Sequence, residues 1–172
     1  MNTRIPRWTA PATVALALVV AGCGSSGSGE PAAARSAPTV SANQLTGLGA
    51  GLGPVLVDDH GHALYASDQE KSGTIRCTGG CLTFWDPLTA AAPTGASNLT
   101  GTLATIRRAD GARQVTYRGM PLYRFTQDPG PGQVTGNDFK DAFAGTSFTW
   151  HAVTTAGLAG SAPSSSPMRN GY

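Results

Sequence analysis

The sequence predicts a small all-β domain, an antiparallel sandwich or open barrel built from two diverged repeats. Three observations support this fold class. Short runs of strand-forming residues alternate with turns rich in Gly, Asp and Pro over residues 54–157. No stretch sustains a convincing helical period over several turns. Two segments share one pattern, and two copies of one supersecondary unit indicate a single domain built by duplication.

The repeat is visible in the letters of the sequence. Residues 61–70, GHALYASDQE, match residues 119–128, GMPLYRFTQD, at the glycine, the leucine, the tyrosine, the glutamine and the final acid. The second copy carries a complete pattern of a tyrosine, an aromatic two residues later and an aspartate three residues after that. These residues are Tyr123, Phe125 and Asp128. The second copy is therefore the intact one.

The first copy is eroded, because it keeps Tyr65 but has Ser67 in place of the aromatic and Glu70 in place of the aspartate. In an extended strand, side chains two positions apart face the same side and can enter the core together. The acid that follows can accept hydrogen bonds from turn amides. We interpret the motif as core and turn chemistry. The alternative is a tyrosine paired with a carboxylate in a cleft that binds a ligand or transfers a proton.

Six or more strands are expected, with signals at residues 55–57, 63–65, 103–106, 114–117, 122–125 and 148–153. Residues 58–61 and 109–112 separate the first two pairs, and both segments combine Asp with Gly, which suits a tight hairpin turn. Arg118 and Gly119 are expected to turn the chain again. Residues 139–143 are expected to form one short helical turn at most.

The first 22 residues have the pattern of a lipoprotein signal peptide. Arg4 and Arg7 precede an apolar run over residues 12–21, which is too short to span a bilayer, since that needs roughly 20 apolar residues. Residues 20–23, VAGC, resemble a bacterial lipobox, which predicts that Cys23 becomes the diacylated N-terminus with acyl chains such as palmitate. Ordinary cleavage that leaves a free thiol at Cys23 is the alternative. Two acyl chains give stable anchoring, so we expect the protein in the cell envelope, on the outer face of the plasma membrane or facing the periplasm.

Composition divides the remaining chain into three parts. Residues 23–53 are rich in Ser, Gly, Ala and Pro and are expected to form a flexible tether. Residues 54–157 are expected to form the β domain, with its repeats at about 54–90 and 113–157. Residues 158–172 have the composition of the tether and are expected to be a disordered tail.

The chain has three cysteines. Lipidation of Cys23 leaves Cys77 and Cys81, which in an oxidising compartment most simply form a local disulfide. A loop this short gives a stabilisation of only about 2 kcal/mol in the chain-entropy model. A redox-active or metal-ligating pair is the alternative. Leu82 stands where a haem attachment site would require a histidine.

Removal of the signal peptide takes away two of the 12 basic residues and leaves ten against ten acidic residues. This balance leaves no net positive charge of the kind that nucleic-acid binding requires. Half of the remaining basic residues lie in one stretch, either on solvent-facing strands or on a surface for an anion, a glycan or a lipid headgroup. They are Arg107, Arg108, Arg113, Arg118 and Arg124.

No catalytic motif is present in the sequence: it has no nucleophile elbow, phosphate-binding glycine loop or zinc-protease helix. We therefore expect neither an enzyme nor a cofactor. His60 and His62 lie two apart beside Asp58 and Asp59, and they are weak candidates for a metal site. An ordinary solvent-facing turn is the alternative. His151, beside a tryptophan on a strand, is interpreted as structural.

Four features in combination resemble a family of bacterial secreted lipoprotein repeats whose biochemical function is largely unknown. They are the Tyr123 motif, the cysteine pair followed by FWDPL at residues 84–88, the run RADGARQVTYRGMPLY at 108–123, and WHAV at 150–153. Ten Arg against two Lys, with abundant Ala and Gly, is typical of a high-GC organism such as an actinobacterium.

These observations together predict a membrane-anchored envelope lipoprotein that acts as a binding or interaction module. Its partner would be an envelope protein, a glycan or a small hydrophobic ligand, in addition to the membrane that holds the lipid. Two alternatives remain open. One is metal or redox handling at the cell surface. The other, implied by the family resemblance, is an accessory role in the use of hydrophobic carbon sources such as alkanes.

Overall fold

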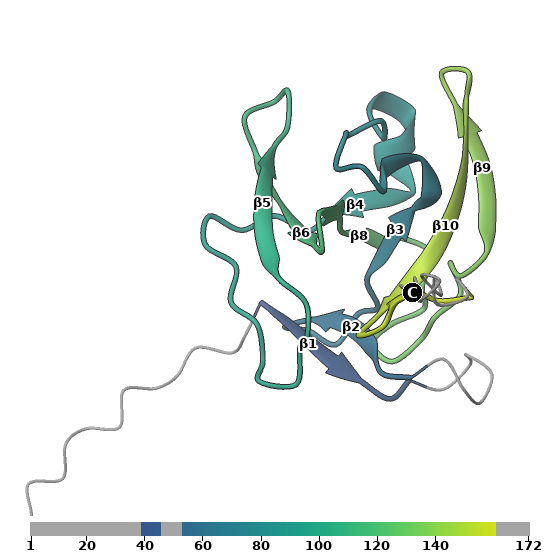
Figure 1. The fold of residues 1–172 in the computed structure, drawn as a ribbon. Coiled ribbons are helices and arrows are strands. Elements are labelled where there is room, and N and C mark those ends of the chain that lie inside the picture. Colours follow the sequence, from purple (N-terminus) through teal and green to yellow (C-terminus); the bar gives the residue numbers. More distant parts are fainter. Residues whose placement is uncertain (1–38, 46–52, 161–172) are drawn as a thin grey trace, which may run out of the picture. The chain divides into compact units, whose positions relative to one another are not determined.

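The computed structural model describes residues 39–45 and 53–160, which form an all-β fold (Figure 1). The predicted signal peptide and Cys23 lie outside the described residues. Within those residues the only helices are two short 3-10 helices, η1 (Asp68–Glu70) and η2 (Gly79–Thr83). The described part of the chain has no helix that is long and apolar enough to cross a membrane. The sheets are antiparallel and do not close into a barrel, which confirms the predicted all-β class as a sandwich.

The larger sheet contains eight strands, and β10 (Thr146–Thr154) is its longest. The main strand order is β1-β2-β10-β3-β8-β4, and β9 and β11 also pair with β10. The other strands are β1 (Val40–Asn43), β2 (Val55–Asp58), β3 (Tyr65–Ser67), β4 (Trp85–Pro87), β8 (Tyr123–Phe125), β9 (Phe139–Phe143) and β11 (Gly157–Leu158). Every one of these pairings is antiparallel.

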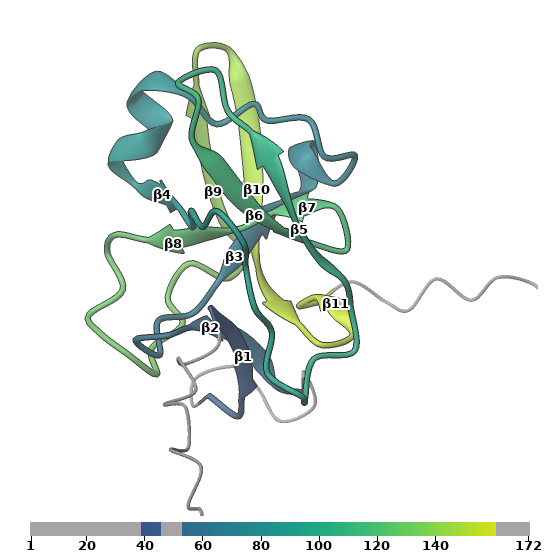
Figure 2. The same ribbon diagram turned by 90° about the vertical axis from the view of Figure 1, so that its left-hand side faces the viewer.

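The smaller sheet has three strands in the order β5 (Leu103–Arg107), β6 (Arg113–Tyr117) and β7 (Met120–Pro121). In the view of Figure 2, β5 and β6 lie in front of β9 and β10 of the larger sheet. The turn between β6 and β7 is the one expected at Arg118 and Gly119, whose φ values are 52° and 82°. Two successive residues with positive φ are the mark of a type I′ hairpin turn, which matches the twist of the flanking strands.

The larger sheet buries apolar side chains on both faces. One cluster joins Leu56, Leu64 and Leu122 of the larger sheet region to Val115 and Tyr117 of the smaller sheet. This cluster is the interior of the sandwich. The second cluster collects the large aromatic side chains on the opposite face, where η2 and β9 cover them. Because side chains alternate along a strand, β3 and β8 contribute to the aromatic cluster through their tyrosines.

The limits predicted for the tether and the tail need correction. The tether was expected over residues 23–53, but Val40–Asn43 form β1, which pairs with β2 in full register. Val40 is fully buried and joins the sandwich interior. The tail was expected from residue 158, but β11 ends at Leu158, and Leu158 and Ala159 are buried. Both segments are ordered because each gives the sheet an apolar residue and a set of backbone hydrogen bonds.

The helical turn expected at residues 139–143 is wrong, because Phe139–Phe143 is the strand β9. It pairs with β10 over five positions and is connected to it by Ala144 and Gly145, with φ values of 49° and 81°. This is again a turn with two positive φ values. The strand expected at 63–65 begins later, at Tyr65, and Ala63 forms only an isolated bridge to Val57.

Candidate functional site

The two copies of the repeat meet at the centre of the larger sheet. Their motif strands β3 and β8 are antiparallel neighbours, and Tyr65 stands directly opposite Tyr123. Each motif strand is flanked on its outer side by a strand that carries a tryptophan, β10 with Trp150 and β4 with Trp85. The order β10-β3-β8-β4 therefore places corresponding elements around a local two-fold axis between the two tyrosines.

The tyrosine of each copy forms its hydrogen bond with the acid of the other copy. The hydroxyl of Tyr65 donates to Asp128 Oδ2 at 2.8 Å, and the hydroxyl of Tyr123 donates to Glu70 Oε1 at 3.2 Å. Each tyrosine thus bonds the acid of the other copy. Burial, together with the adjacent carboxylate, raises the pKa of both tyrosines, so both remain neutral donors.

Both acids also fix the backbone that follows them. Glu70 Oε1 accepts hydrogen bonds from the backbone N–H groups of Arg76 and Cys77, at 2.5 and 2.7 Å. Asp128 Oδ1 accepts from the N–H and the hydroxyl of Thr135, at 2.9 and 2.6 Å. Each acid therefore closes the loop after its own strand while it binds the tyrosine of the other strand. This geometry supports the interpretation of the motif as core and turn chemistry.

Four aromatic rings form a continuous stack on the outer face of the larger sheet. Its centre is the pair Trp85 and Trp150, whose ring centroids are 3.9 Å apart and nearly parallel. Phe125 stacks on Trp85 at 4.5 Å, and Phe148 stacks on Trp150 at 5.5 Å. Both indole N–H groups donate to Asp141 on β9, at 2.7 and 2.9 Å. Sequence reasoning missed Asp141, although its place between two phenylalanines in an alternating segment was a strand signal.

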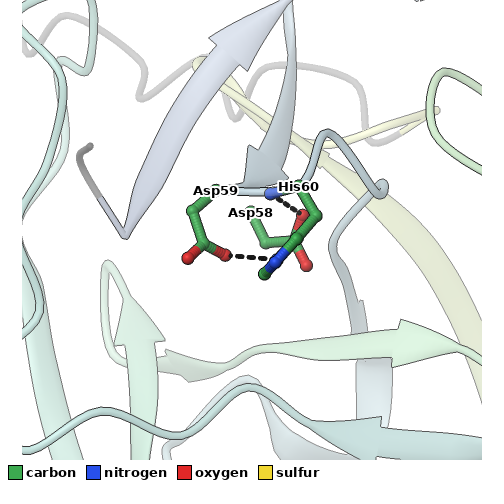
Figure 3. Close-up of side chains that lie close together, drawn as sticks. All are labelled: Asp58, Asp59 and His60. Carbon is green, nitrogen blue, oxygen red and sulfur yellow. Dashed lines mark hydrogen bonds and ion pairs between the residues drawn. The ribbon is translucent and has the colours of Figure 1, made fainter.

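The histidine turn brings together three groups that a metal can use, Asp58, Asp59 and His60, with one potential ligand atom of each within 4.8 Å of the others (Figure 3). Asp58 Oδ1 accepts the N–H groups of His60 and His62, both at 2.9 Å, and Oδ2 pairs with Arg124 Nε at 2.5 Å. Burial alone would raise the pKa of Asp58, but these hydrogen bonds lower it below its usual value. A metal ion at this turn would compete with Arg124 for Asp58.

His60 and His62, the two weak metal candidates, also face carboxylates with Nδ1. His60 Nδ1 lies 2.8 Å from Asp59 Oδ1, and His62 Nδ1 lies 3.5 Å from Asp58 Oδ2. Their ring centroids are 6.4 Å apart. The other histidine, His151, lies between two acids, Asp68 of η1 and Asp138 before β9, and is mostly buried. Within this turn, Asp58 alone contacts β8, through Arg124, while Asp59, His60 and His62 contact one another or Asp58.

The predicted disulfide between Cys77 and Cys81 is present and fully buried. Redox-active cysteines need access to a partner, so this position supports a structural bond. Next to the disulfide, a cleft of about 600 Å³ opens between residues 73–82 and the β5–β6 hairpin. This volume lies in the range of small-molecule sites. Ile75, Leu82 and Ile106 give its walls a mainly apolar character.

A buried arginine lines this cleft. The side chain of Arg108 is only 5% exposed, and it donates to two neutral oxygens, Gln114 Oε1 at 2.5 Å and the carbonyl of Cys77 at 2.9 Å. Among the described residues its one close carboxylate is Asp110, whose Oδ2 lies 3.9 Å from Nε. That distance is too long for a hydrogen bond. Among the described residues the guanidinium therefore has no directly hydrogen-bonded acid, although the buried Glu70 lies nearby, bonded to the Cys77 N–H and to the Tyr123 hydroxyl.

The arginine-rich stretch does not form one surface. Arg124 on β8 pairs with Asp58 and with Asp86. Arg118 in the β6–β7 turn donates to the carbonyl of Thr155 at 2.8 Å. Arg108 is buried beside the cleft. Neighbours in the sequence are thus directed to separate places, and the stretch is not a single basic patch.

The fold and the central pair of motif strands define a class, that of all-β proteins with an internally paired repeat. Residues 104–154 match the family described as a secreted repeat of unknown function, which confirms the resemblance drawn from the sequence. The match contains the intact motif from Tyr123 to Asp128 and leaves residues 61–70 outside it. The family description indicates an extracellular or envelope location. No curated protein and no solved structure shows significant similarity to the chain.

Proposed function

We propose that this protein is an envelope lipoprotein, anchored through Cys23, whose β domain is a ligand-binding module with its site in the cleft beside the disulfide. The observation that carries the proposal is the cleft itself, which combines a volume of about 600 Å³ with apolar walls and a buried arginine. Apolar clefts with a few well-placed polar groups are the usual form of small-molecule sites. The match to a secreted repeat and the lipobox at residues 20–23 support the location.

The anchor is tested in the host by labelling with an alkyne analogue of palmitate, followed by membrane fractionation. The native chain is expected in the membrane fraction with the label attached. Cys23→Ser should lose the label and leave the membrane fraction. The matched control is the double variant Cys77→Ser/Cys81→Ser, which should keep the label. An unlabelled native chain would overturn the anchoring part of the proposal.

The binding module is tested by recording amide NMR spectra of the protein with a set of small apolar and amphiphilic fragments. We expect shift changes to gather at residues 73–82 and 106–110. Ile106→Glu, which places a charge in the apolar wall, should remove them. Ala104→Glu is the matched control, because Ala104 is exposed on the same strand and lies outside the cleft lining. Shift changes scattered over the surface, or none with any fragment, would overturn the module.

A further inference from the structure

We infer that the ligand of this cleft is a single-chain amphiphile with a carboxylate head, bound with its head at Arg108 and its chain against Ile75, Leu82 and Ile106. The inference rests on the proposed function and names the ligand class of the same site. Its basis is an arrangement of charge and apolar surface that is complementary to such a molecule.

The charge argument starts from the state of Arg108 in the free protein. Buried charges in proteins are normally paired, because removal of an ion from water is costly. Arg108 is buried but bonds only neutral oxygens, and its Nε–H has no acceptor at hydrogen-bonding distance among the described residues. A guanidinium binds a carboxylate with geometry that suits its planar fork of donors. The buried acid Glu70 lies nearby, but its Oε1 already accepts from Tyr123 and from the N–H groups of Arg76 and Cys77. An entering carboxylate would give Arg108 a directly bonded anionic partner.

The other charged groups of the cleft favour the same ligand. Arg107 adds a second, exposed cation, and Asp110 is the only acid in the lining. The Asp110 side chain is 62% exposed and lies 3.9 Å from Arg108 Nε. Its Oδ1 accepts the N–H of Ala112 at 2.9 Å, so the Asp110 carboxylate stays at the turn with Oδ2 beside Arg108, as a weak internal competitor for a ligand carboxylate. Two cations against one carboxylate give the cleft a positive lining.

The head site is held in place before a ligand binds. Cys77 fixes one side of Arg108 through its carbonyl, and Cys77 is itself fixed by the disulfide and by its N–H bond to Glu70. Gln114, fully buried on β6, fixes the other side. A preformed site loses little conformational entropy on binding, which favours affinity for a small ligand.

A free amphiphile fits these observations better than a membrane surface does. Electrostatic binding to a lipid surface uses several basic side chains on one face. Of the five arginines in the stretch, only Arg107 and Arg108 line the cleft. Arg118 and Arg124 are engaged elsewhere, with a carbonyl and with acids. The chain is also neutral once the signal peptide is removed. One buried cation in an apolar cleft, with one exposed cation at its edge, suits one anionic head with one chain.

The test measures binding of three probes with the same chain and different heads, by titration calorimetry at neutral pH and below their micelle concentrations. The probes are dodecanoate, dodecanol and dodecyltrimethylammonium. We expect dodecanoate to bind at least tenfold more tightly than dodecanol and the ammonium probe to bind most weakly. Amide shifts with dodecanoate should gather at residues 73–82 and 106–110. Vesicles of phosphatidylglycerol should not compete.

Two variants separate the charge effect from folding. Asp110→Asn removes the internal competitor from an exposed turn and should increase dodecanoate affinity severalfold, with no change for dodecanol. Asp59→Asn is the matched control, since Asp59 is an exposed acid in another turn, and it should change nothing. Arg108→Gln should abolish the preference for dodecanoate, provided that its near-ultraviolet circular dichroism remains native.

Equal affinity for dodecanoate and dodecanol, with shifts still in the cleft, would overturn the carboxylate head and leave the binding module standing. Tighter binding to vesicles than to free dodecanoate would overturn the inference in favour of a membrane surface. Absence of binding by all three probes would also overturn it. The proposed function itself falls only when the wider fragment set also fails to bind in the cleft.

Discussion

The hydrogen bonds between the two copies can be measured with phenylalanine substitutions at the two motif tyrosines and neutral isosteres at the two acids. Tyr123→Phe removes a donor from the fully buried Glu70, so we expect a loss of about 2 kcal/mol of unfolding free energy, as for a hydrogen bond to a charged group. Tyr65→Phe removes a donor from Asp128, which is partly exposed and keeps its bonds to Thr135. Water can replace this donor at Asp128, but the change also removes the acceptor of the Gly136 N–H, a long bond of 3.3 Å, and the expected loss is about 1–2 kcal/mol.

Double-mutant cycles then identify the partners. The pairs Tyr123 with Glu70 and Tyr65 with Asp128 should show coupling free energies of about 1–2 kcal/mol, because phenylalanine removes the donor and the isostere removes the acceptor's charge from the same bond. The pairs within one copy, Tyr65 with Glu70 and Tyr123 with Asp128, should be additive within about 0.5 kcal/mol. Urea unfolding of the oxidised protein, followed by the fluorescence of the stacked tryptophans, gives these values. Coupling within a copy and additivity between copies would refute the reasoning.

Three further predictions concern stability. Ser67→Ala should raise the unfolding free energy by about 1 kcal/mol in urea titrations, because the Ser67 hydroxyl is buried without a hydrogen-bond partner. A variant less stable than the native protein would show that this hydroxyl is hydrogen-bonded. Cys77→Ser/Cys81→Ser should lower it by about 2 kcal/mol, and equal stability of the oxidised and reduced native chains would contradict this. The pKa of Asp58 is lowered in the fold. The stability that Asp58 contributes is therefore present above its ordinary pKa of 3.8 and is lost as the pH falls through its native pKa. Asp58→Asn should flatten this loss in acid unfolding curves, and an unchanged slope would argue against the pair with Arg124.

The sequence predicted the structure best at turns whose residue types favour a particular backbone conformation. Gly61 and Gly111 adopt φ values of 85° and 88° in turns that the letters had placed correctly. The hairpin before β10 was missed because its first turn residue is Ala144, which seldom takes a positive φ. β1 was missed because Val40 and Ala42 stand in a stretch of small residues with no long apolar run. Its order comes from pairing with β2, a contact that local sequence does not encode.

The candidate site depended even more on contacts distant in sequence. The motif does not indicate which acid each tyrosine bonds, whereas the adjacency of β3 and β8 gives each tyrosine the acid of the other copy. The cleft is built from residues 73–82 and 106–110, which share no motif. Arg108 appeared in the sequence as one of five neighbouring arginines. Only its burial against Gln114 and Cys77 separates it from the others.

The eroded first copy is as necessary to the fold as the intact one. Ser67 lies opposite Trp150 in the sheet register, at the place that corresponds to Phe125 opposite Trp85. The ring that the first copy lacks is supplied by Phe148, which stacks on the outer side of Trp150. Since the aromatic stack is complete and both tyrosines need acids from the other copy, the motif residues of both copies are occupied in holding the sheet together. This leaves the cleft between residues 73–82 and the β5–β6 hairpin, which contains none of the motif residues and is lined by Arg108, as the site for the proposed ligand.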